Sequence, residues 1–297
     1  MTLLKKIKNI IQEIKRSKQD NFEVRFLMGS MLAKNSSQAK SIKEAEFKVF
    51  SQFGDDGIIQ FLLNRIPIKV DKFVEFGVES YEESNTRFLL MHDNWQGLVI
   101  DGSPDNIAYI KNDPIYWRYN LTAISSFITA ENINQLLQEN GFSGKIGILS
   151  IDIDGNDYWV WQAINVCDPD IVVIEYNSLF GSERSITIPY KPDYYRMDAH
   201  YSGLYFGASL QALCDLGKLK GYALVGCNKA GNNAYFVKNN LVSELQVLSP
   251  EEGFVHARFR EGRDKEGNLT FANEPERRKE ILGQPVVNVK TGLTETF

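Results

Sequence analysis

Short apolar runs alternate with helical patterns through the middle of the chain. The apolar runs predict five strands, at residues 70–77, 97–101, 117–121, 146–152 and 171–176, of which the third is the weakest. Helical spacing between them predicts helices at 82–92, 105–111, 131–140 and 158–164. Nearly continuous apolar strands separated by helices indicate a parallel sheet that is covered on both faces. With right-handed crossovers, the economical topology is a doubly wound α/β sheet.

Two further strands follow these five. A helix at 208–219 precedes apolar runs at 222–227 and 234–238, and a Gly/Asn-rich turn at 228–232 joins the two runs. Such a turn between two strands is typical of an antiparallel hairpin. The predicted fold is therefore a doubly wound, mostly parallel seven-stranded sheet with a C-terminal antiparallel hairpin.

The two ends of the chain have different patterns. Leu4, Ile7, Ile11 and Ile14 recur at helical spacing among lysines, which predicts a basic amphipathic helix from Thr2 to about residue 17. This helix would pack on the core or on a partner subunit; the alternative is the surface of an anionic membrane. A looser stretch at 35–43 follows it. The tail from 249 to 297 is polar with little helical period. We expect an N-terminal helical segment at 1–45, a Rossmann-like domain at 46–240 and a C-terminal extension at 241–297, with homo-oligomer contacts through the helix or the extension.

Charge and cysteine content narrow the class of protein. A net charge of −5 offers no basic footprint, so a nucleic acid partner is not expected. The cysteines, Cys167, Cys214 and Cys227, are odd in number and form no CxxC pair, which is typical of a reducing compartment. No apolar run approaches the roughly 20 residues that span a bilayer, and the N-terminus has no signal-peptide pattern. We therefore expect a soluble, cytoplasmic protein.

Polar side chains follow the predicted strands at the point where each one ends. Ligands in a doubly wound sheet bind beyond the carboxyl ends of its strands. The residues found there are Glu75, Gly77, Asp101, Asn120, Asp152, Asp154, Glu175 and Asn177. Carboxylates at the ends of core strands need a partner or solvent. Together they predict a site.

The turn after the first strand decides which ligand the site takes. Asp101 follows Gly77 by 24 residues, a spacing at which a carboxylate accepts the hydroxyls of a ribose, in NAD and S-adenosylmethionine alike. A pyrophosphate needs the bare backbone of G-x-G-x-x-G. Residues 77–83 read GVESYEE, with one glycine and three glutamates. Because these glutamates repel a pyrophosphate and attract a sulfonium and an ammonium, the turn favours S-adenosylmethionine.

These segments resemble a known family. Six stretches within residues 47–238 are similar to class I, Rossmann-like methyltransferases. They are VEFGVES…SNT, GLVIDGS, ILSIDIDGNDYWVWQAI, IVVIEYN, FGASLQALCDLGKLKGYALVGC and SQFGDDGII. The bacterial group that they resemble is distantly related to FkbM-type O-methyltransferases. The first motif departs from the family pattern, because Glu79 and Tyr81 replace its later glycines.

The resemblance implies roles for individual residues. Glu75, Gly77 and Glu79 would hold the methionine part of the cofactor, and Asp101 its ribose. Asp152 would face the sulfonium, and Gln52 would close over the cofactor. The residues beside the adenine would be Gly102, Ser103, Thr122 and Ala123.

The acceptor side offers several candidates. Asp154, Asp157 and Glu175 supply oxygens suited to Mg²⁺, and macrolide sugar O-methyltransferases resemble this arrangement. The alternative is that Asp154 and Asp157 cap the helix that begins near residue 158. His200, in a segment rich in Tyr, Pro and Gly, is a candidate general base. Five nearby tyrosines stack on an acceptor or pack the segment itself; they are Tyr190, Tyr194, Tyr195, Tyr201 and Tyr205.

The sequence therefore predicts an S-adenosylmethionine-dependent methyltransferase that acts on a hydroxyl of a sugar or another small polar metabolite. Two alternatives stay open, a non-catalytic scaffold with the same fold and a nucleotide-sugar-modifying Rossmann enzyme. The latter predicts a Tyr-x-x-x-Lys pair in the site, and the sequence offers no convincing one.

Overall fold

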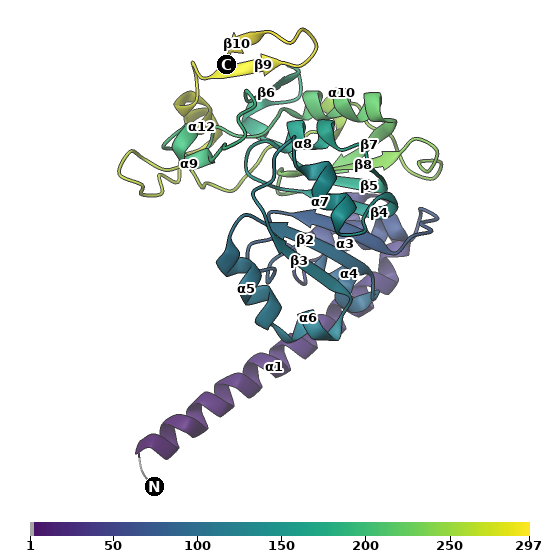
Figure 1. Ribbon diagram of the computed structural model, residues 1–297, viewed down its shortest axis with the longest axis vertical. Coiled ribbons are helices and arrows are strands. Elements are labelled where there is room, and N and C mark those ends of the chain that lie inside the picture. The colour runs from purple at the N-terminus through teal and green to yellow at the C-terminus, as the bar shows by residue number, and fades with distance from the viewer. Residues whose placement is uncertain (1–2) are drawn as a thin grey trace.

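A seven-stranded sheet forms the centre of the structure. The structure, a computed structural model, describes residues 3–297, apart from the side chains of residues 3–7, 9, 11, 15 and 18. The strand order is β3-β2-β1-β4-β5-β8-β7. The strands are β1 (Lys72–Phe76), β2 (Gln96–Asp101), β3 (Leu121–Ser125), β4 (Gly144–Ile151), β5 (Cys167–Glu175), β7 (Tyr222–Cys227) and β8 (Asn233–Lys238). β1 to β5 pair in parallel, whereas β8 is antiparallel to both β5 and β7. The doubly wound sheet with its closing hairpin is confirmed (Figure 1).

Helices cover both faces of the sheet. One face packs against α7 (Ile133–Glu139), α8 (Asp157–Ala163) and α10 (Leu210–Lys220). The opposite face packs against α2 (Ile42–Ala45), α3 (Asp55–Leu63), α4 (Arg87–His92) and α5 (Pro104–Asn112). Successive strand residues point to opposite faces. Val74 and Phe76 therefore belong to the first core and Phe73 to the second.

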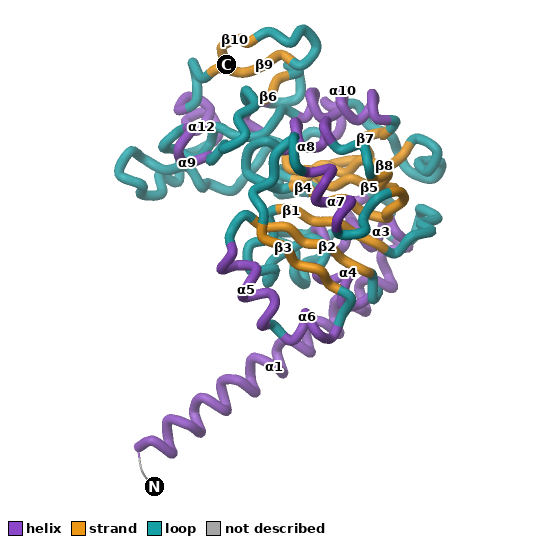
Figure 2. Tube along the Cα trace, viewed as in Figure 1, coloured by secondary structure: helices purple, strands orange, loops and turns teal. Residues whose placement is uncertain are grey.

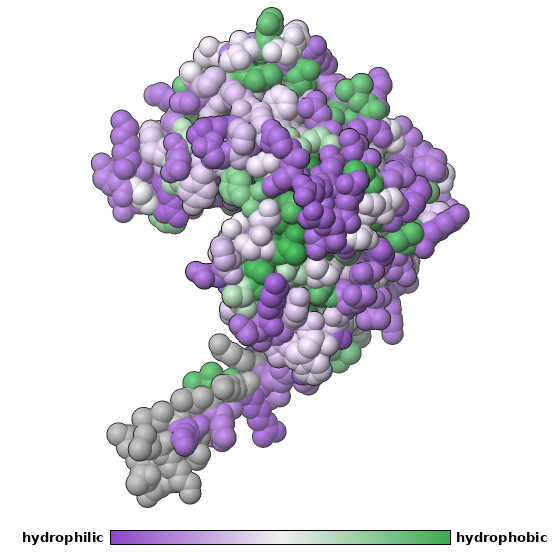
Figure 3. Space-filling view, in the orientation of Figure 1, coloured by the Kyte–Doolittle hydropathy of each residue, from purple (hydrophilic) through white to green (hydrophobic). Residues whose placement is uncertain are grey.

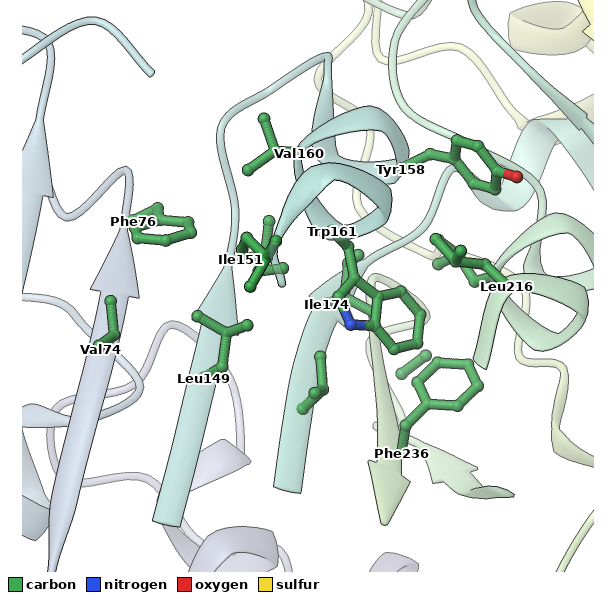
Figure 4. Packing of buried hydrophobic residues seen from close by; sticks show 14 of the residues in the cluster. Val74, Phe76, Leu149, Ile151, Tyr158, Val160, Trp161, Ile174, Leu216 and Phe236 are labelled. Atoms are coloured by element: carbon green, nitrogen blue, oxygen red, sulfur yellow. The ribbon is translucent and has the colours of Figure 1, made fainter. Parts of the chain in front are cut away.

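The two tryptophans of α8 point in different directions. Trp161 is buried against Phe236 of β8, with ring centroids 5.1 Å apart (Figure 4). Trp159 is only partly buried, and its ring N–H donates to the carbonyl of Ile188 at 2.9 Å. One side chain therefore builds the core, and the other fixes a loop beyond the sheet.

The third strand begins later than the sequence pattern predicts. Residues 117–121 were expected to form it, but β3 starts at Leu121, and Pro114–Arg118 form a short helix, α6. The side chain of Asp113 caps this helix by accepting from the backbone N–H of Ile115 at 2.8 Å, and Pro114 occupies its first turn. An Asp-Pro start favours a helix even in an aromatic segment that reads as a strand.

The N-terminal helix is much longer than predicted. α1 runs from Leu3 to Asn35, so the predicted end near residue 17 is wrong. Its C-terminal half packs on the domain through a second set of residues, Phe22, Phe26, Gly29 and Ala33. A Cβ on Gly29 would lie 2.3 Å from Val49, so glycine permits this close approach. Of the predicted packing residues, Ile14 is exposed, and the side chains of Leu4, Ile7 and Ile11 lie outside the described residues.

The segment after β5 and the C-terminal extension both contain regular elements that the sequence pattern did not indicate. They are η2 (Ser178–Phe180), β6 (Ile186–Thr187), α9 (Arg196–Ala199), α11 (Pro250–Gly253), α12 (Glu274–Glu280), β9 (Pro285–Asn288) and β10 (Thr294–Thr296), some of them before the extension itself. β9 pairs with β6 and β10 in a three-stranded antiparallel sheet. We call residues 178–207 and 254–297 the cap; most of it is loop (Figure 2).

Two short helices, η1 (Ser36–Gln38) and α2, occupy the looser stretch after α1. Within residues 3–297, no helix combines the length and the apolarity that crossing a bilayer would require.

Candidate functional site

A cavity of about 590 Å³ lies beyond the carboxyl ends of β1, β2, β4 and β5, between the sheet and the cap. On this side the outline of the molecule is indented between the cap and the α5 region (Figure 3). Eight carboxylates line the cavity: Glu75, Glu79, Glu83, Asp101, Asp152, Asp154, Glu175 and Glu261. Among the described residues of its wall, Arg196 is the one basic side chain. The cavity therefore attracts cations and repels anions.

The turn after β1 has a positive φ at three positions, and only the first of them is a glycine. Gly77, Glu79 and Tyr81 all have positive φ, of 70°, 46° and 61°. Only glycine adopts this region without cost. At Gly77 a side chain is also sterically excluded, because a Cβ would lie 1.6 Å from the carbonyl oxygen of Asp152. Glu79 and Tyr81 therefore adopt a backbone conformation that glycine would adopt without cost.

Glu75 holds this turn in place. Its carboxylate accepts from the hydroxyls of Ser84 and Thr86, and from the backbone N–H groups of Asn85 at 2.9 Å and Thr86 at 3.1 Å. Burial raises the pKa of Glu75, and these donors oppose the rise. Tyr81 is fully buried, and its hydroxyl contacts that of Thr86 at 3.0 Å. Tyr81 thus replaces a glycine by a side chain that anchors the loop, and Glu75 is engaged within the protein.

Asp101 lies at the end of β2 and faces the cavity. One carboxylate oxygen accepts from the backbone N–H of Glu79 at 2.8 Å. The other accepts from the N–H of Ser103 at 2.8 Å and from the Asn106 amide at 3.0 Å. Each carboxylate oxygen has two lone pairs. The oxygen that contacts Glu79 therefore retains a free acceptor position.

Asp152, Asp154 and Glu175 form an acidic cluster, in which one oxygen from each residue lies within 4.8 Å of the others. Burial, and then the neighbouring carboxylates, raise the pKa values of Asp152 and Glu175 well above the ordinary range. Oε2 of Glu175 is buried and has no hydrogen-bond partner. The cluster therefore holds protons, or it holds a cation that replaces them.

Arg196, on the cap, is the positively charged side chain that pairs with the acidic cluster. It forms ion pairs with Asp154 and, at 3.0 Å, with Glu261 of the C-terminal extension. Its guanidinium lies 4.4 Å from the centroid of the Phe206 ring. Burial alone would lower the pKa of Arg196, but Asp154 and Glu261 raise it. Arg196 therefore links the loop after β4 to the C-terminal extension.

Asp157 shapes the loop after β4. Its buried carboxylate accepts from the backbone N–H groups of Ile153 and Gly155, both at 2.9 Å. Burial raises the pKa of Asp157 to about 6. Asp157 is absent from the cavity wall, and the loop it holds places Asp154 at a φ of 55°. The donors to Asp157 precede α8, which begins at Asp157 itself, so this carboxylate holds the loop and does not cap the first turn of the helix. Asp154, in contrast, faces the cavity.

The other predicted site residues fall into two groups. Gln52 and Gly102 line the cavity. Ser103 is the N-cap of α5, and its backbone N–H donates to the carboxylate of Asp101. Thr122 and Ala123 lie inside β3, and Ala123 is buried in the core. Because β3 starts later than predicted, the place expected for this pair belongs to residues 126–128, which line the cavity.

His200 is not among the residues that line the cavity. Its Nδ1 lies 2.8 Å from the hydroxyl of Ser202, and burial lowers its pKa. The geometry does not bring His200 to the acidic cluster, so it does not support a general-base role for this residue.

Several wall residues had no signal in the sequence. Phe259 of the extension stacks on Phe53, with ring centroids 5.8 Å apart, and both line the cavity. Asn233 lines it too, and its amide donates to Asp55 at 3.0 Å. Asp55 belongs to the SQFGDDGII segment, so this segment fixes the wall near Glu175. Such residues come from segments far apart along the chain.

Comparisons with known proteins give the following. No protein-family model and no curated protein matches the chain. A solved S-adenosylmethionine-dependent methyltransferase from Clostridium acetobutylicum is similar at 10% identity, over 62% of this chain and 90% of that chain, with a TM-score of 0.40. The N-terminal domain of EvdMO1 with SAH bound is similar at 10% identity, over 70% and 94%, also with a TM-score of 0.40. TehB from Haemophilus influenzae is similar at 10% identity and a TM-score of 0.37, over 56% of this chain.

The matches span 57% of TehB and 52% of PhzM, just over half of each protein. These identities are too low to transfer residue roles.

Proposed function

We propose that this chain is an S-adenosylmethionine-dependent methyltransferase whose cofactor binds in the cavity beyond β1, β2 and β4. The observation that carries the proposal is the acidic lining of the cavity, eight carboxyl groups to one arginine, around a turn with positive φ at the end of β1. The sulfonium and ammonium of the cofactor suit this field, whereas the pyrophosphate of NAD does not. The seven-stranded sheet with its antiparallel hairpin agrees with this class of enzyme.

The residues divide the cofactor between them. The free acceptor position of Asp101 suits the ribose hydroxyls. The backbone of the turn at 77–79 and the carboxylate of Glu79 suit the methionine end. Phe127 and Ile128, which follow β3, supply an apolar wall for the adenine. Phe53 and Phe259, which stack on each other, and Gln52 also line the cavity and would contact the cofactor.

The acidic cluster is suited to act as the general base that takes the proton from a hydroxyl acceptor. Asp152 and Glu175 have raised pKa values, so each is a stronger base than an ordinary carboxylate once ionised. The positive charge of a bound cofactor favours the ionised form. Cofactor binding therefore prepares the base for the acceptor.

The same cluster also suits Mg²⁺, which is the second candidate. Three carboxylate oxygens within 4.8 Å and the unpartnered Oε2 of Glu175 fit a hard cation. Asp152, Asp154 and Glu175 would hold the ion, and Asp154 would exchange its pairing with Arg196. Bound there, a metal supplies Lewis-acid lowering of the acceptor's pKa.

A second hollow supports a sugar or similar polar acceptor. It has a volume of about 320 Å³ and is lined by the tyrosines Tyr190, Tyr194, Tyr195 and Tyr205, together with Lys191 and Asp198. Tyr194 and Tyr195 also line the main cavity. Tyrosine offers a flat apolar ring and a polar edge, which suits a ring with hydroxyl groups.

Calorimetric titration tests the cofactor. We expect S-adenosylmethionine to bind and NAD not to bind. Asp101→Asn should weaken cofactor binding at least tenfold, because charged hydrogen bonds contribute about 1.5–3 kcal/mol and tenfold corresponds to about 1.4 kcal/mol. Asp105→Asn, on the exposed side of α5, is the matched control and should bind normally. No binding of S-adenosylmethionine at millimolar concentration would contradict the cofactor and leave a scaffold with this fold.

Transfer of a labelled methyl group from S-adenosylmethionine tests the acceptor. We expect neutral sugars to accept the methyl group and sugar phosphates to be rejected, because the acidic cavity repels a phosphate. Asp154→Asn and a chelator separate the two chemical candidates. If both leave turnover intact, the metal role is wrong and the carboxylate base stands.

A further inference from the structure

α1 carries an apolar stripe that no described part of the chain covers. Five of its side chains are between 52% and 61% exposed; they are Ile10, Ile14, Val24, Met28 and Met31. The N-terminal half of the helix projects away from the domain (Figure 1). A soluble surface rarely leaves so many large apolar side chains in a row without a partner.

The stripe follows a heptad repeat along the whole helix. Positions alternate by four and three residues at 3, 7, 10, 14, 17, 21, 24, 28, 31 and 35, and the sequence is apolar at seven of them. With 33 residues, α1 is close to five heptads long. A period of 3.5 residues keeps one seam facing a partner helix in a left-handed pair. Position a comprises residues 7, 14, 21, 28 and 35, and position d comprises 3, 10, 17, 24 and 31.

The domain contacts the opposite side of the helix. Phe22 and Gly29 occupy b positions, and Phe26 and Ala33 occupy f positions. These are the positions that point away from the seam of a coiled coil. Folding of the domain onto α1 therefore leaves the seam accessible.

The positions that flank the seam complement a second, parallel copy. In a parallel pair, each g position faces the e position five residues later on the other helix. Asp20 would face the second copy's Arg25, and Leu27 would face the second copy's Leu32; all four are exposed. In the sequence, Glu13 and Lys18 stand in the same relation. In an antiparallel pair, the basic e positions would face each other.

We propose that α1 forms a parallel, two-stranded coiled coil with α1 of a second copy of this chain. Asn21, near the middle of the helix, occupies an a position, where an asparagine pair fixes register and favours two strands. Ser17 and Asn21 interrupt the stripe, which would weaken insertion into a membrane but suits a paired seam. The dimer is independent of the proposed methyl transfer.

Sedimentation equilibrium of the full chain over the micromolar range tests the proposal. We expect the mass of two chains for the unmodified protein. Ile14→Asp with Met28→Asp should halve that mass, because two charges would lie in the seam. Gln12→Asp with Gln19→Asp places the same charges at exposed f positions and should keep two chains. Far-ultraviolet circular dichroism and the domain's melting temperature establish that each variant is folded.

Disulfide formation tests the orientation. In a parallel, in-register pair the two copies of residue 17 face each other, so Ser17→Cys should cross-link on mild oxidation, whereas Gln19→Cys should not. A one-chain mass for the unmodified protein overturns the proposal, as does a two-chain mass for the Ile14→Asp, Met28→Asp variant. An intact dimer without the Ser17→Cys cross-link overturns the parallel arrangement. Sedimentation of a one-chain protein with phosphatidylserine vesicles would assign the stripe to membranes instead.

Discussion

Replacement of Gly77 by alanine tests how closely β1 and β4 approach at the floor of the cavity. The φ of 70° at Gly77 costs an L-residue about 1–2 kcal/mol. The added Cβ would lie 1.6 Å from the carbonyl oxygen of Asp152, and real Cβ contacts essentially never fall below 3.0 Å. The two strand ends must separate, and overpacking of this kind costs about 1–3 kcal/mol. We therefore expect Gly77→Ala to lower the free energy of unfolding by about 2–5 kcal/mol.

Urea unfolding of Gly77→Ala and a matched variant, Gly141→Ala, separates the two contributions. Gly141 has a φ of 77° and nothing within 4 Å of an added Cβ, so it should lose only the backbone cost of about 1–2 kcal/mol. Gly77→Ala should also lose cofactor affinity at least tenfold, because Glu75, Asp152 and the turn all move, whereas Gly141→Ala should bind normally. Equal losses of stability in the two variants would refute the close approach.

Three further predictions concern the turn, the cap and the pH. Glu79→Gly should stabilise the fold by up to about 1 kcal/mol, because glycine adopts the positive φ without cost. Tyr81→Gly should destabilise the fold by about 3–5 kcal/mol, because the Tyr81 side chain is fully buried. Urea unfolding midpoints that move in the same direction for both variants would contradict this difference. Arg196→Met should lower the free energy of unfolding by about 2–3 kcal/mol and speed proteolysis between residues 189 and 203, because the ion pairs to Asp154 and Glu261 are lost. Lys191→Met, at an exposed lysine, is the control and should behave as the unmodified protein. The affinity for S-adenosylmethionine should rise with pH, because a bound cation lowers the raised pKa values of Asp152 and Glu175 and protons are released. Binding enthalpies that do not depend on the ionisation enthalpy of the buffer would argue against this release.

Arg196 of the cap and the two faces of α1 are features that local sequence patterns do not predict. Arg196 lies in a short helix without an apolar period, and its partners are Asp154, 42 residues earlier, and Glu261 in the extension. Nothing local distinguishes it from a surface arginine. α1 has two faces with different roles, one against the domain and one along the heptad seam. The helical pattern was recognised only up to residue 17, because the residues of α1 that contact the domain, from Phe22 onward, add a second apolar face that obscures the spacing.

Local patterns in the sequence were sufficient to predict the order of the strands along the chain, the closing hairpin and the edge of the sheet at which the cavity opens. Apolar period, turn residues and caps are local properties, and the carboxylates follow directly from the strand ends. Even Gly77 was identified in this way, although the reason for it, the carbonyl of Asp152, lies on another strand.

Four features depend on contacts that no local pattern contains: the start of β3, the length of α1, the pairing of β9 with β6 and the absence of Asp157 from the cavity wall. Each depends on a contact or cap whose energy competes with the local pattern, as Asp113 does at α6 and Val49 does at Gly29. Contacts between distant segments leave no period in the sequence. The wall of the cavity that would meet an acceptor is built almost entirely from such contacts.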